Sequence, residues 1–308
     1  SFLRSGNDIA KEHGDKKVAI IADEMHEANV YTEIAAGIGL QSVEEHPDWR
    51  FVAMSATHNE DALRKPLKKV NGIEDSNSLI PSVTIEGRPY TITHHERPEN
   101  SAWEVYAREC QEDKTSMIFT SGKAEIDHKN EKTRAQLDRE SPGGSRNVVF
   151  RKLHSELTER ELAHISDPVP EGMRLVIVAT PAGMSGITIP GLTCVISDGT
   201  INHQELDEDD IGGLARAYLS KAGIVQQFGR GGRDVPGGKG YLVKPVMIEE
   251  DKILDKGQVV EVEAMPYVAF DERKEFEPPE IYNMNLSGIV LTVANLERKF
   301  TSVNEYLQ

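Results

Sequence analysis

Leu175-Val176-Ile177-Val178 is a continuous apolar run, and a loop rich in glycine and hydroxyl side chains, residues 179–191, follows it directly. Continuous apolarity without alternation is typical of a strand that is buried on both faces of a parallel sheet. Four other short apolar runs end in polar or glycine-bearing loops: residues 18–22, 51–54, 116–119 and 193–196. The segments between them predict helices at 59–70, 124–139 and 158–165. We therefore expect an α/β fold with parallel sheets.

The domain organisation is indicated by residues 75–100, which are rich in Pro, Ser, Asn and charge, with three prolines that would interrupt a long helix. A boundary in this segment predicts a first domain at 1–95 and a second at 96–247. From residue 248 to 308 the pattern loosens into a short C-terminal extension, in which 275–280 looks like a linker before a final helical piece. Residues 198–219 hold an acidic run followed by Gly212-Gly213, which predicts a projecting β-hairpin.

Composition limits the classes of function. The chain has 308 residues, 38% hydrophobic and 28% charged, which suits a soluble globular protein with two domains. Its net charge of -16 argues against broad adhesion to nucleic acid, although a local basic groove stays open. The two cysteines, Cys110 and Cys194, make neither a disulfide framework nor a four-ligand metal site, so we expect a reducing, cytoplasmic location. No apolar run approaches the roughly 20 residues of a membrane span.

Two acids, Asp23 and Glu24, follow the first apolar run directly. Ligands bind at the carboxyl ends of strands in open parallel sheets, so these acids are well placed for a metal ion. The alternative is a solvated acidic turn that opens the next helix. Ser55 and Thr57 follow the second run in the same way, where they either contact the acidic loop or cap a helix near residue 59.

Two arginines, Arg230 and Arg233, lie in the glycine-rich segment Gln226-Gln227-Phe228-Gly229-Arg230-Gly231-Gly232-Arg233. On a helix, a spacing of three residues would place both on one face, and guanidinium groups bind phosphate in a bidentate way. The alternative is a pair of surface cations near a helix end. Loop 179–191 and, more weakly, Ser121-Gly122-Lys123 could bring backbone amides close to phosphates.

Taken in order, these segments resemble the superfamily 2 DExH-box helicases, in the style of viral RNA helicases of the flavivirus and potyvirus type and of cellular DEAH-box enzymes. Asp23-Glu24-Met25-His26 resembles motif II, Ser55-Ala56-Thr57 motif III, and 117–121 motif IV. Residues 180–191 resemble motif V, and 226–233 motif VI. The resemblance implies two RecA-like parallel-sheet domains, the first of them incomplete.

The resemblance also implies roles for the matched residues. Asp23 would hold Mg²⁺ and Glu24 would orient the attacking water, while His26 would bond to the motif III region rather than to a metal. The residues implied to meet ATP from the second domain are Gly186, Gln226, Arg230 and Arg233. The residues implied to contact the RNA backbone or to couple hydrolysis to domain movement are Ser55, Thr57, Thr120, Ser121, Thr180 and Thr188.

The sequence also departs from this family. Gln227 stands where another arginine is frequent, and Met184 where a glutamate is usual. No Gly-x-x-x-x-Gly-Lys-Ser/Thr loop occurs in the chain, so we expect a fragment that alone hydrolyses ATP poorly or not at all. His94-His95 falls in the expected linker, where both rings would be solvated.

The sequence therefore predicts an NTP-dependent RNA helicase that uses ATP and Mg²⁺ and binds a single strand through its backbone. DNA is the alternative to RNA as the bound nucleic acid. For a viral protein, viral replication proteins would be partners and the host cytoplasm the location. The rival functions are a translocase or remodelling ATPase without unwinding, and a catalytically inactive binding module with the same fold.

Overall fold

The computed structural model describes residues 16–25, 30–46, 48–55, 83, 85, 90–181, 187–206, 212–250, 259–262, 265–278 and 280. The chain forms two compact units. The first consists of Ser1–Ser82, Gln204–Ala215 and Glu277–Gln308, and the second of Val83–His203 and Arg216–Phe276. The domain boundary predicted between residues 95 and 96 lies inside a strand of the second unit, β3, Ile92–Arg97.

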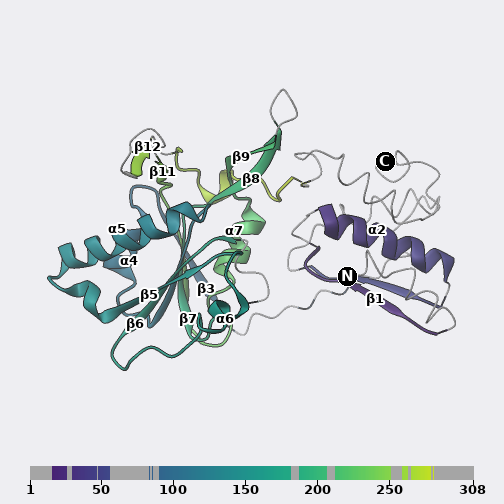
Figure 1. Cartoon of the computed structure of the whole chain (residues 1–308), viewed down its shortest axis with the longest axis horizontal. Helices are drawn as coiled ribbons and strands as arrows, with labels where there is room; N and C mark the ends of the chain where they lie inside the picture. The colour runs from purple at the N-terminus through teal and green to yellow at the C-terminus, as the bar shows by residue number, and fades with distance from the viewer. Residues whose placement is uncertain are drawn as a thin grey trace. The chain divides into compact units, whose positions relative to one another are not determined.

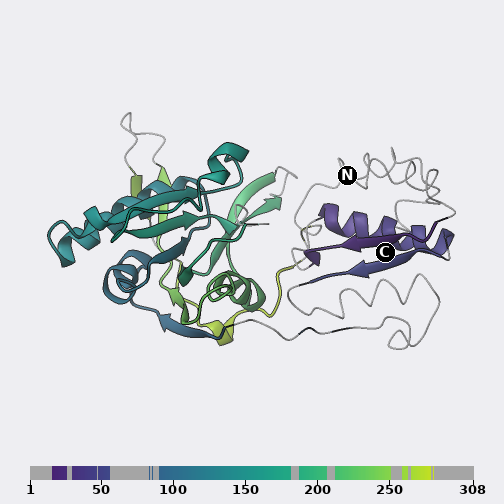
Figure 2. The ribbon, with the colours of Figure 1, turned by 90° about the horizontal axis from the view of Figure 1, so that it is seen from below.

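In the first unit two short strands lie under a helix. β1, Ala19–Ala22, pairs in parallel with β2, Arg50–Ala53, and α2, Val30–Glu45, covers them (Figure 2). A methyl group on Gly39 would lie 2.8 Å from the ring of Phe51 and 3.3 Å from Ile20, so this glycine lets the helix approach both strands closely. Both predicted strands are confirmed. The helix predicted at 59–70 lies outside the described residues.

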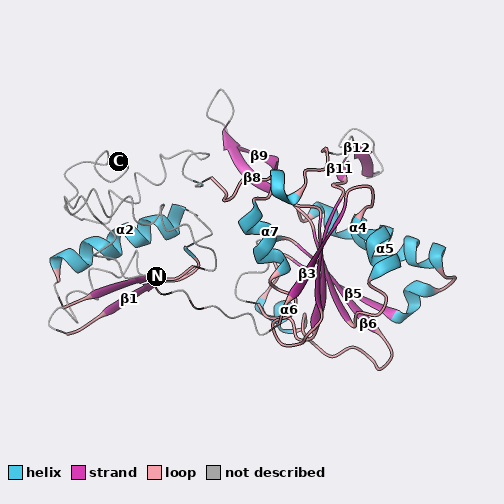
Figure 3. Ribbon diagram, turned by 180° about the vertical axis from the view of Figure 1, so that it is seen from behind, coloured by secondary structure: helices cyan, strands magenta, loops and turns pink. Residues whose placement is uncertain are grey.

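The second unit contains a six-stranded sheet in which all neighbouring strands are parallel. Its order is β3-β10-β7-β4-β6-β5. Figure 3 shows the strands of this sheet in magenta. The bounds are β4, Thr115–Phe119; β5, Val148–Leu153; β6, Arg174–Ala179; β7, Leu192–Ser197; and β10, Gly238–Val243. The apolar runs that predicted strands at 116–119, 175–178 and 193–196 are therefore β4, β6 and β7, the three central neighbours β7-β4-β6.

Helices cover both faces of this sheet (Figure 1). α4, Ala102–Glu109, and α5, Ala124–Glu140, pack on one face, while α6, Glu159–Ala163, and α7, Lys221–Phe228, lie on the other. Ile118 of β4 belongs to the core under α4 and α5, whereas Met117 and Phe119 belong to the core under α7. Burial of alternate residues on opposite faces explains why the run is apolar throughout. The predicted helices at 124–139 and 158–165 are confirmed as α5 and α6.

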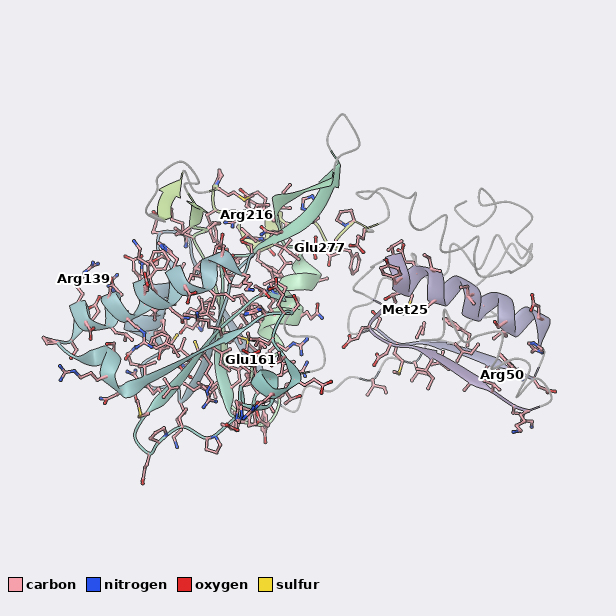
Figure 4. The ribbon with its side chains drawn as sticks, viewed as in Figure 1. Met25, Arg50, Arg139, Glu161, Arg216 and Glu277 are labelled. Carbon is pink, nitrogen blue, oxygen red and sulfur yellow. The ribbon has the colours of Figure 1, made fainter. Side chains whose placement is uncertain are left out.

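Capping boxes begin two of these helices. The carboxylate of Glu104 accepts hydrogen bonds from the amide and the hydroxyl of Ser101, at 2.9 Å each, at the start of α4. Glu161 accepts from the amide of Thr158 at 2.8 Å at the start of α6 (Figure 4). Such capping boxes satisfy amides that have no partner within the helix, and each cap contributes about 1 kcal/mol.

The predicted hairpin is confirmed as β8, Thr200–Leu206, and β9, Gly212–Tyr218, which pair with each other. Beyond the sheet, β11, Met247–Glu250, pairs antiparallel with β12, Val259–Val262, and two short 3₁₀ turns occur, η3, Gly144–Asn147, and η5, Phe270–Glu272. The placement of His94 and His95 in a linker was wrong, because both lie on β3, which is hydrogen-bonded to β10. In the described part of the chain, no helix has the length and apolarity to cross a bilayer.

Candidate functional site

The acidic pair of the first unit lies on the loop that follows β1. The amide of Met25 donates to the carbonyl of Met54 at 3.0 Å, and the amide of Met54 donates to the carbonyl of Ala22 at 2.7 Å. These bonds hold the loop that carries Asp23 and Glu24 against the end of β2, which Ser55 follows. The structure thus brings the acids and Ser55 to the same edge of the two-stranded sheet.

Glu24 has an unusual backbone conformation. Its φ of +57° makes it the one residue other than glycine, within the described residues, in the left-handed region. Its amide donates to Oδ1 of Asp23 at 2.8 Å. Local strain of this kind occurs often at functional sites, because surrounding contacts must hold it. The predicted site residues His26, Thr57 and Gly186 lie outside the described residues.

In the second unit the two arginines lie in a turn. α7 ends at Phe228, and the amide of Arg230 donates to the carbonyl of Gln227 at 3.1 Å. Gly232 follows with φ of +68°, and its amide donates to the carbonyl of Leu192 at 3.2 Å. The expectation that a helix face presents both arginines therefore does not apply, since the backbone has left the helix before Arg230.

This arginine turn, residues 229–234, is bonded to the segment that precedes β7. The guanidinium of half-buried Arg230 donates to the carbonyl of Ile187 at 3.3 Å, and the carboxylate of Asp234 accepts from the amide of Gly191 at 2.8 Å. Thr188 lies between these two points of attachment. Arg233 is exposed, and its Nε donates to the carbonyl of Gly229 at 3.4 Å. Two segments that lie apart in the sequence thus form one surface.

The glutamines before this turn differ in burial. Gln226 is half-buried, whereas Gln227 is 6% exposed. Within the described structure, neither amide atom of the Gln227 side chain has a hydrogen-bond partner. Phe228 packs directly on β10, where a methyl group on Gly240 would lie 2.4 Å from its ring. The residue that replaces the frequent arginine is therefore a buried amide.

A further group of predicted residues lies at the carboxyl ends of β4 and β6. The amide of Thr120 donates to the carbonyl of Ala179, and that of Thr180 to Leu153, at 2.9 Å each. The hydroxyls of Thr120 and Ser121 both donate to Oε2 of Glu125, the latter at 3.1 Å. Thr120, Ser121 and Thr180 are therefore together at one edge of the sheet.

Sequence reasoning missed the charged side chains beneath this edge. Glu125 of α5 forms an ion pair with Arg216 of β9, which is labelled in Figure 4. One helical turn later, the ammonium of Lys129 pairs with Asp198 and donates to the carbonyl of Phe119 at 3.0 Å. The signal in the sequence is the spacing of four between Glu125 and Lys129, which places both on one face of a helix. Their partners are distant in the sequence and could not be identified.

Arg273 also binds the base of the hairpin. Its Nη1 donates to the carbonyls of Gly199 and Leu219, at 2.6 and 3.0 Å, and these residues flank the hairpin. Gly199 has φ of +65°, and a methyl group there would lie 2.5 Å from the guanidinium. Burial lowers the pKa of Arg273 and of Arg216, although a guanidinium remains charged at neutral pH.

The two cysteines lie together in the core. Their sulfur atoms are 2.8 Å apart, and with Asp113 they form a cluster of three ligand atoms within 4.8 Å. Asp113 already accepts hydrogen bonds from Thr193 at 2.7 Å and from the ammonium of Lys239 at 3.1 Å. Burial raises the pKa of the Cys194 thiol well above its usual value, which favours the protonated thiol over a metal-binding thiolate.

Residues 101–234 match the family model of the helicase conserved C-terminal domain. This segment is therefore similar to a helicase C-terminal domain. It includes the loop after β4, the segment before β7 and the arginine turn.

Curated relatives match more of the chain than residues 101–234. The probable ATP-dependent RNA helicase DHX35 homolog of Caenorhabditis elegans is 28% identical over 73% of this chain and 32% of its own length. The ATP-dependent RNA helicase DHX33 of Mus musculus is 22% identical over 90% of this chain and 37% of its own length. The chain spans about a third of the length of these two relatives. Both are cellular proteins, so the viral type expected from the sequence is not supported.

Among solved structures, the Escherichia coli DEAH/RHA helicase HrpB is similar with a TM-score of 0.68, at 20% identity, over 98% of this chain and 35% of that chain. A second structure, the E. coli DExH-box NTPase HrpB, gives 0.64 at 21% identity, over 95% and 33%. At this identity the likeness shows the fold. The expected α/β fold with a parallel-sheet core like that of RecA-like helicase domains is confirmed.

Proposed function

We propose that this chain works in an ATP-dependent RNA helicase that couples nucleotide hydrolysis to movement along a single strand and to duplex unwinding. The observation that carries the proposal is the bonding of the arginine turn to residues 187–191 inside a helicase C-terminal domain. Relatives that are named ATP-dependent RNA helicases support the assignment.

In this proposal the arginine turn meets the triphosphate. Arg230 is anchored by the bond from its guanidinium to the carbonyl of Ile187, and a guanidinium can bind phosphate oxygens in a bidentate way. Arg233 is exposed next to it and supplies a second cation. Gly186 and Gln226 are proposed to lie near the nucleotide. Arginines in this role neutralise charge that develops on the transferring phosphoryl group.

The acidic loop is proposed to serve the same reaction. Asp23 is exposed, and its carboxylate offers the hard oxygen ligands that Mg²⁺ prefers, so the donor set fits that ion. Bound Mg²⁺ would neutralise charge on the phosphates of ATP. Asp23 accepts a hydrogen bond from the backbone amide of Glu24. The carboxylate of Glu24 would accept a proton from the attacking water. Ser55 and Thr57 would couple hydrolysis to domain movement.

RNA is proposed to bind along the carboxyl edge of the six-stranded sheet. Thr120, Ser121 and Thr180 lie buried at this edge, and exposed Thr188 lies on the segment before β7. Hydroxyls that contact phosphate oxygens do not read the bases. Little sequence preference follows. Viral replication proteins find no support as partners, and the cytoplasmic location predicted from the cysteine content stays a prediction.

Glu24→Gln in the full-length protein tests the proposal. We expect RNA-stimulated ATP turnover to fall by about 10²-fold or more, because general-base catalysis contributes on that order. Asp48→Asn, which neutralises an exposed acid in the same unit, should leave turnover unchanged. Equal turnover in Glu24→Gln and wild type would remove Glu24 from the reaction.

Two comparisons separate the rival functions. ATP turnover with displacement of a paired RNA strand supports a helicase, whereas turnover without displacement indicates a translocase or remodelling ATPase. Wild-type protein that binds RNA without ATP turnover indicates a binding module.

A further inference from the structure

The strap, which we define as residues 266–275 of the second unit, bonds to the start of α7. The amide of Lys221 donates to the carbonyl of Lys274 at 2.9 Å. The next amide, that of Ala222, donates to the carbonyl of Glu275 at 3.1 Å. These are the first two amides of α7, and such amides have no partner within their own helix. The strap therefore completes the start of the helix that leads into the arginine turn.

One side chain of the strap, Arg273, bonds to the chain on both sides of the hairpin. It is 5% exposed, and its Nη1 donates to the carbonyls of Gly199, before β8, and Leu219, after β9. The amide of Leu219 donates to the carbonyl of Gly199 at 2.9 Å, so the same two residues close the hairpin. Ser220 comes next and begins α7, where its hydroxyl accepts from the amide of Gly223 at 3.1 Å. Arg273 thus holds the point where the hairpin ends and α7 begins.

The strap also reaches the other end of α7 through aromatic rings. Phe228 is the last residue of α7, and its ring centroid lies 5.2 Å from that of His94 on β3. The ring of His94 lies 6.4 Å from that of Phe270 in the strap. Two residues further along β3, the carboxylate of Glu96 accepts from the hydroxyl of Tyr267 and from the amide of Phe270. Both ends of α7 are therefore linked to the strap.

α7 connects directly to the arginine turn. The amide of Gly229 donates to the carbonyl of Val225 at 2.8 Å, so helical bonding continues past the last residue of the helix. The amide of Arg230 then donates to the carbonyl of Gln227 at 3.1 Å. Because hydrogen bonds join successive turns, a helix of eight residues carries a shift of its start to its end. A displacement at Ser220 would therefore move Arg230.

We propose that Arg273 is a positioning residue for ATP hydrolysis, which holds the carbonyls of Gly199 and Leu219 and so sets the place of α7 and of the arginine turn. This inference rests on the proposed function for its catalytic arm. Arg273 acts through the turn and does not touch the nucleotide. It lies outside residues 101–234, the segment that matches the family model.

Hydrogen exchange in the 308-residue chain, read by mass spectrometry, tests the positioning. Arg273→Met keeps much of the bulk of the side chain and removes its donors. We expect the amides of residues 221–232 to exchange about tenfold faster than in wild type, because their opening no longer breaks the bonds of Arg273. The amides of α4 should keep their wild-type rate. Arg273→Lys keeps the charge and one donor group, so residues 221–232 should exchange at an intermediate rate.

The matched control is Arg151→Met. The Nη1 of Arg151 also donates to two carbonyls, those of Ile165 and Asp167, at 2.6 and 2.7 Å. Arg151 lies on β5, at the edge of the sheet opposite β3. The variant therefore loses bonds of the same kind at a place remote from the strap, and residues 221–232 should exchange as in wild type.

ATP turnover in the full-length protein tests the catalytic arm. The arginines are proposed to act on charge that develops during phosphoryl transfer, so Arg273→Met should lower kcat about tenfold and leave KM for ATP within about threefold. Rates are taken per folded molecule, with the folded fraction from circular dichroism at the assay temperature. A variant that merely loses stability then keeps the wild-type kcat, and Arg151→Met should do so.

Wild-type exchange at residues 221–232 in Arg273→Met, or equally accelerated exchange in α4, would overturn the inference. If Arg273→Met does not fold, Arg273→Lys decides by the same two criteria. An unchanged kcat per folded molecule overturns the role in hydrolysis. Full-length wild type without ATP turnover overturns the proposed function, and the exchange of residues 221–232 then still decides whether Arg273 positions the turn.

Discussion

The carboxylate of Asp234 accepts the amide of Gly191 at 2.8 Å, which joins the end of the arginine turn to the start of β7. Gly191 has φ of +68°, a conformation that favours glycine. The bond forms on the exposed side of the domain, where it closes the segment that also holds Arg230. Asp234 therefore fixes the position of the arginine turn without belonging to the expected helicase motifs.

Asp234→Ala should lower the free energy of unfolding by about 1 kcal/mol, since one hydrogen bond to a charged acceptor is lost at an exposed site. Asp234→Asn keeps a side-chain oxygen and should recover most of that loss. Urea unfolding followed by circular dichroism measures both. Glu171→Ala, at an exposed turn, is the control and should match wild type. Equal stability of Asp234→Ala and wild type would mean that the bond does not hold the turn.

Gln227→Met should stabilise the second unit by about 1 kcal/mol. The buried amide of Gln227 lacks a partner in the described structure, and an apolar side chain of similar shape avoids the cost of burying it. Gln111→Met makes the contrast, because the Gln111 amide donates to the carbonyl of Tyr106 at 2.9 Å and its replacement should destabilise. If both variants lose stability, Gln227 has a partner that the structure does not reveal.

Three strands of the six-stranded sheet, with two of its helices, could be predicted from sequence, and the reason is burial on both faces. The missed strands differ in composition. β3 reads Ile-Thr-His-His-Glu-Arg and lies at one edge of the sheet, while β5 carries Arg151 and Lys152 at the other edge. Edge strands tolerate polar side chains, so their apolar signal is weak. β10 was hidden by Gly238 and Gly240, the second of which makes room for Phe228.

Part of the candidate site could be predicted from sequence because several of its residues follow strands that the sequence reveals. Asp23, Ser55 and Thr120 each follow an apolar run that forms a strand, so the position of each strand end locates them. Arg216 and Arg273 act through tertiary contacts with Glu125, Gly199 and Leu219, and no local pattern encodes such partners. Tertiary structure alone reveals that the hairpin is held by buried charges.

Stability should depend on pH through the pair formed by Arg97 and Glu109. Two hydrogen bonds of 2.7 Å join the guanidinium to the carboxylate, and this bonding lowers the pKa of Glu109. A carboxyl group with a lowered folded-state pKa stabilises the protein above its unfolded pKa, and this contribution is lost as pH falls through the folded value. The free energy of unfolding of wild type should therefore exceed that of Glu109→Gln at neutral pH, and this difference should vanish in acid.

Because both side chains are about one-third exposed, we expect this benefit to be about 0.5–1 kcal/mol at pH 7. Urea unfolding of wild type and Glu109→Gln at neutral pH and below about pH 4, the usual range of a glutamate pKa, measures the difference. Glu99→Gln, on an exposed turn, should leave stability unchanged at each pH. A difference that persists undiminished in acid would contradict the assignment to this ion pair.

Arg230→Lys and Arg233→Lys should separate charge from geometry in the arginine turn. Lysine keeps the charge and loses the planar fork that binds phosphate oxygens in pairs, so we expect RNA-stimulated ATP turnover to fall by about 10²-fold or more in each variant. Arg230→Lys also loses the hydrogen bond to the carbonyl of Ile187, so its unfolding temperature should fall slightly. The unfolding temperature of Arg233→Lys should not change, because Arg233 is exposed. Arg160→Lys, on the exposed side of α6, is the matched control and should change neither quantity. If turnover survives in Arg233→Lys while thermal stability falls, this arginine supports the turn and does not contact the nucleotide.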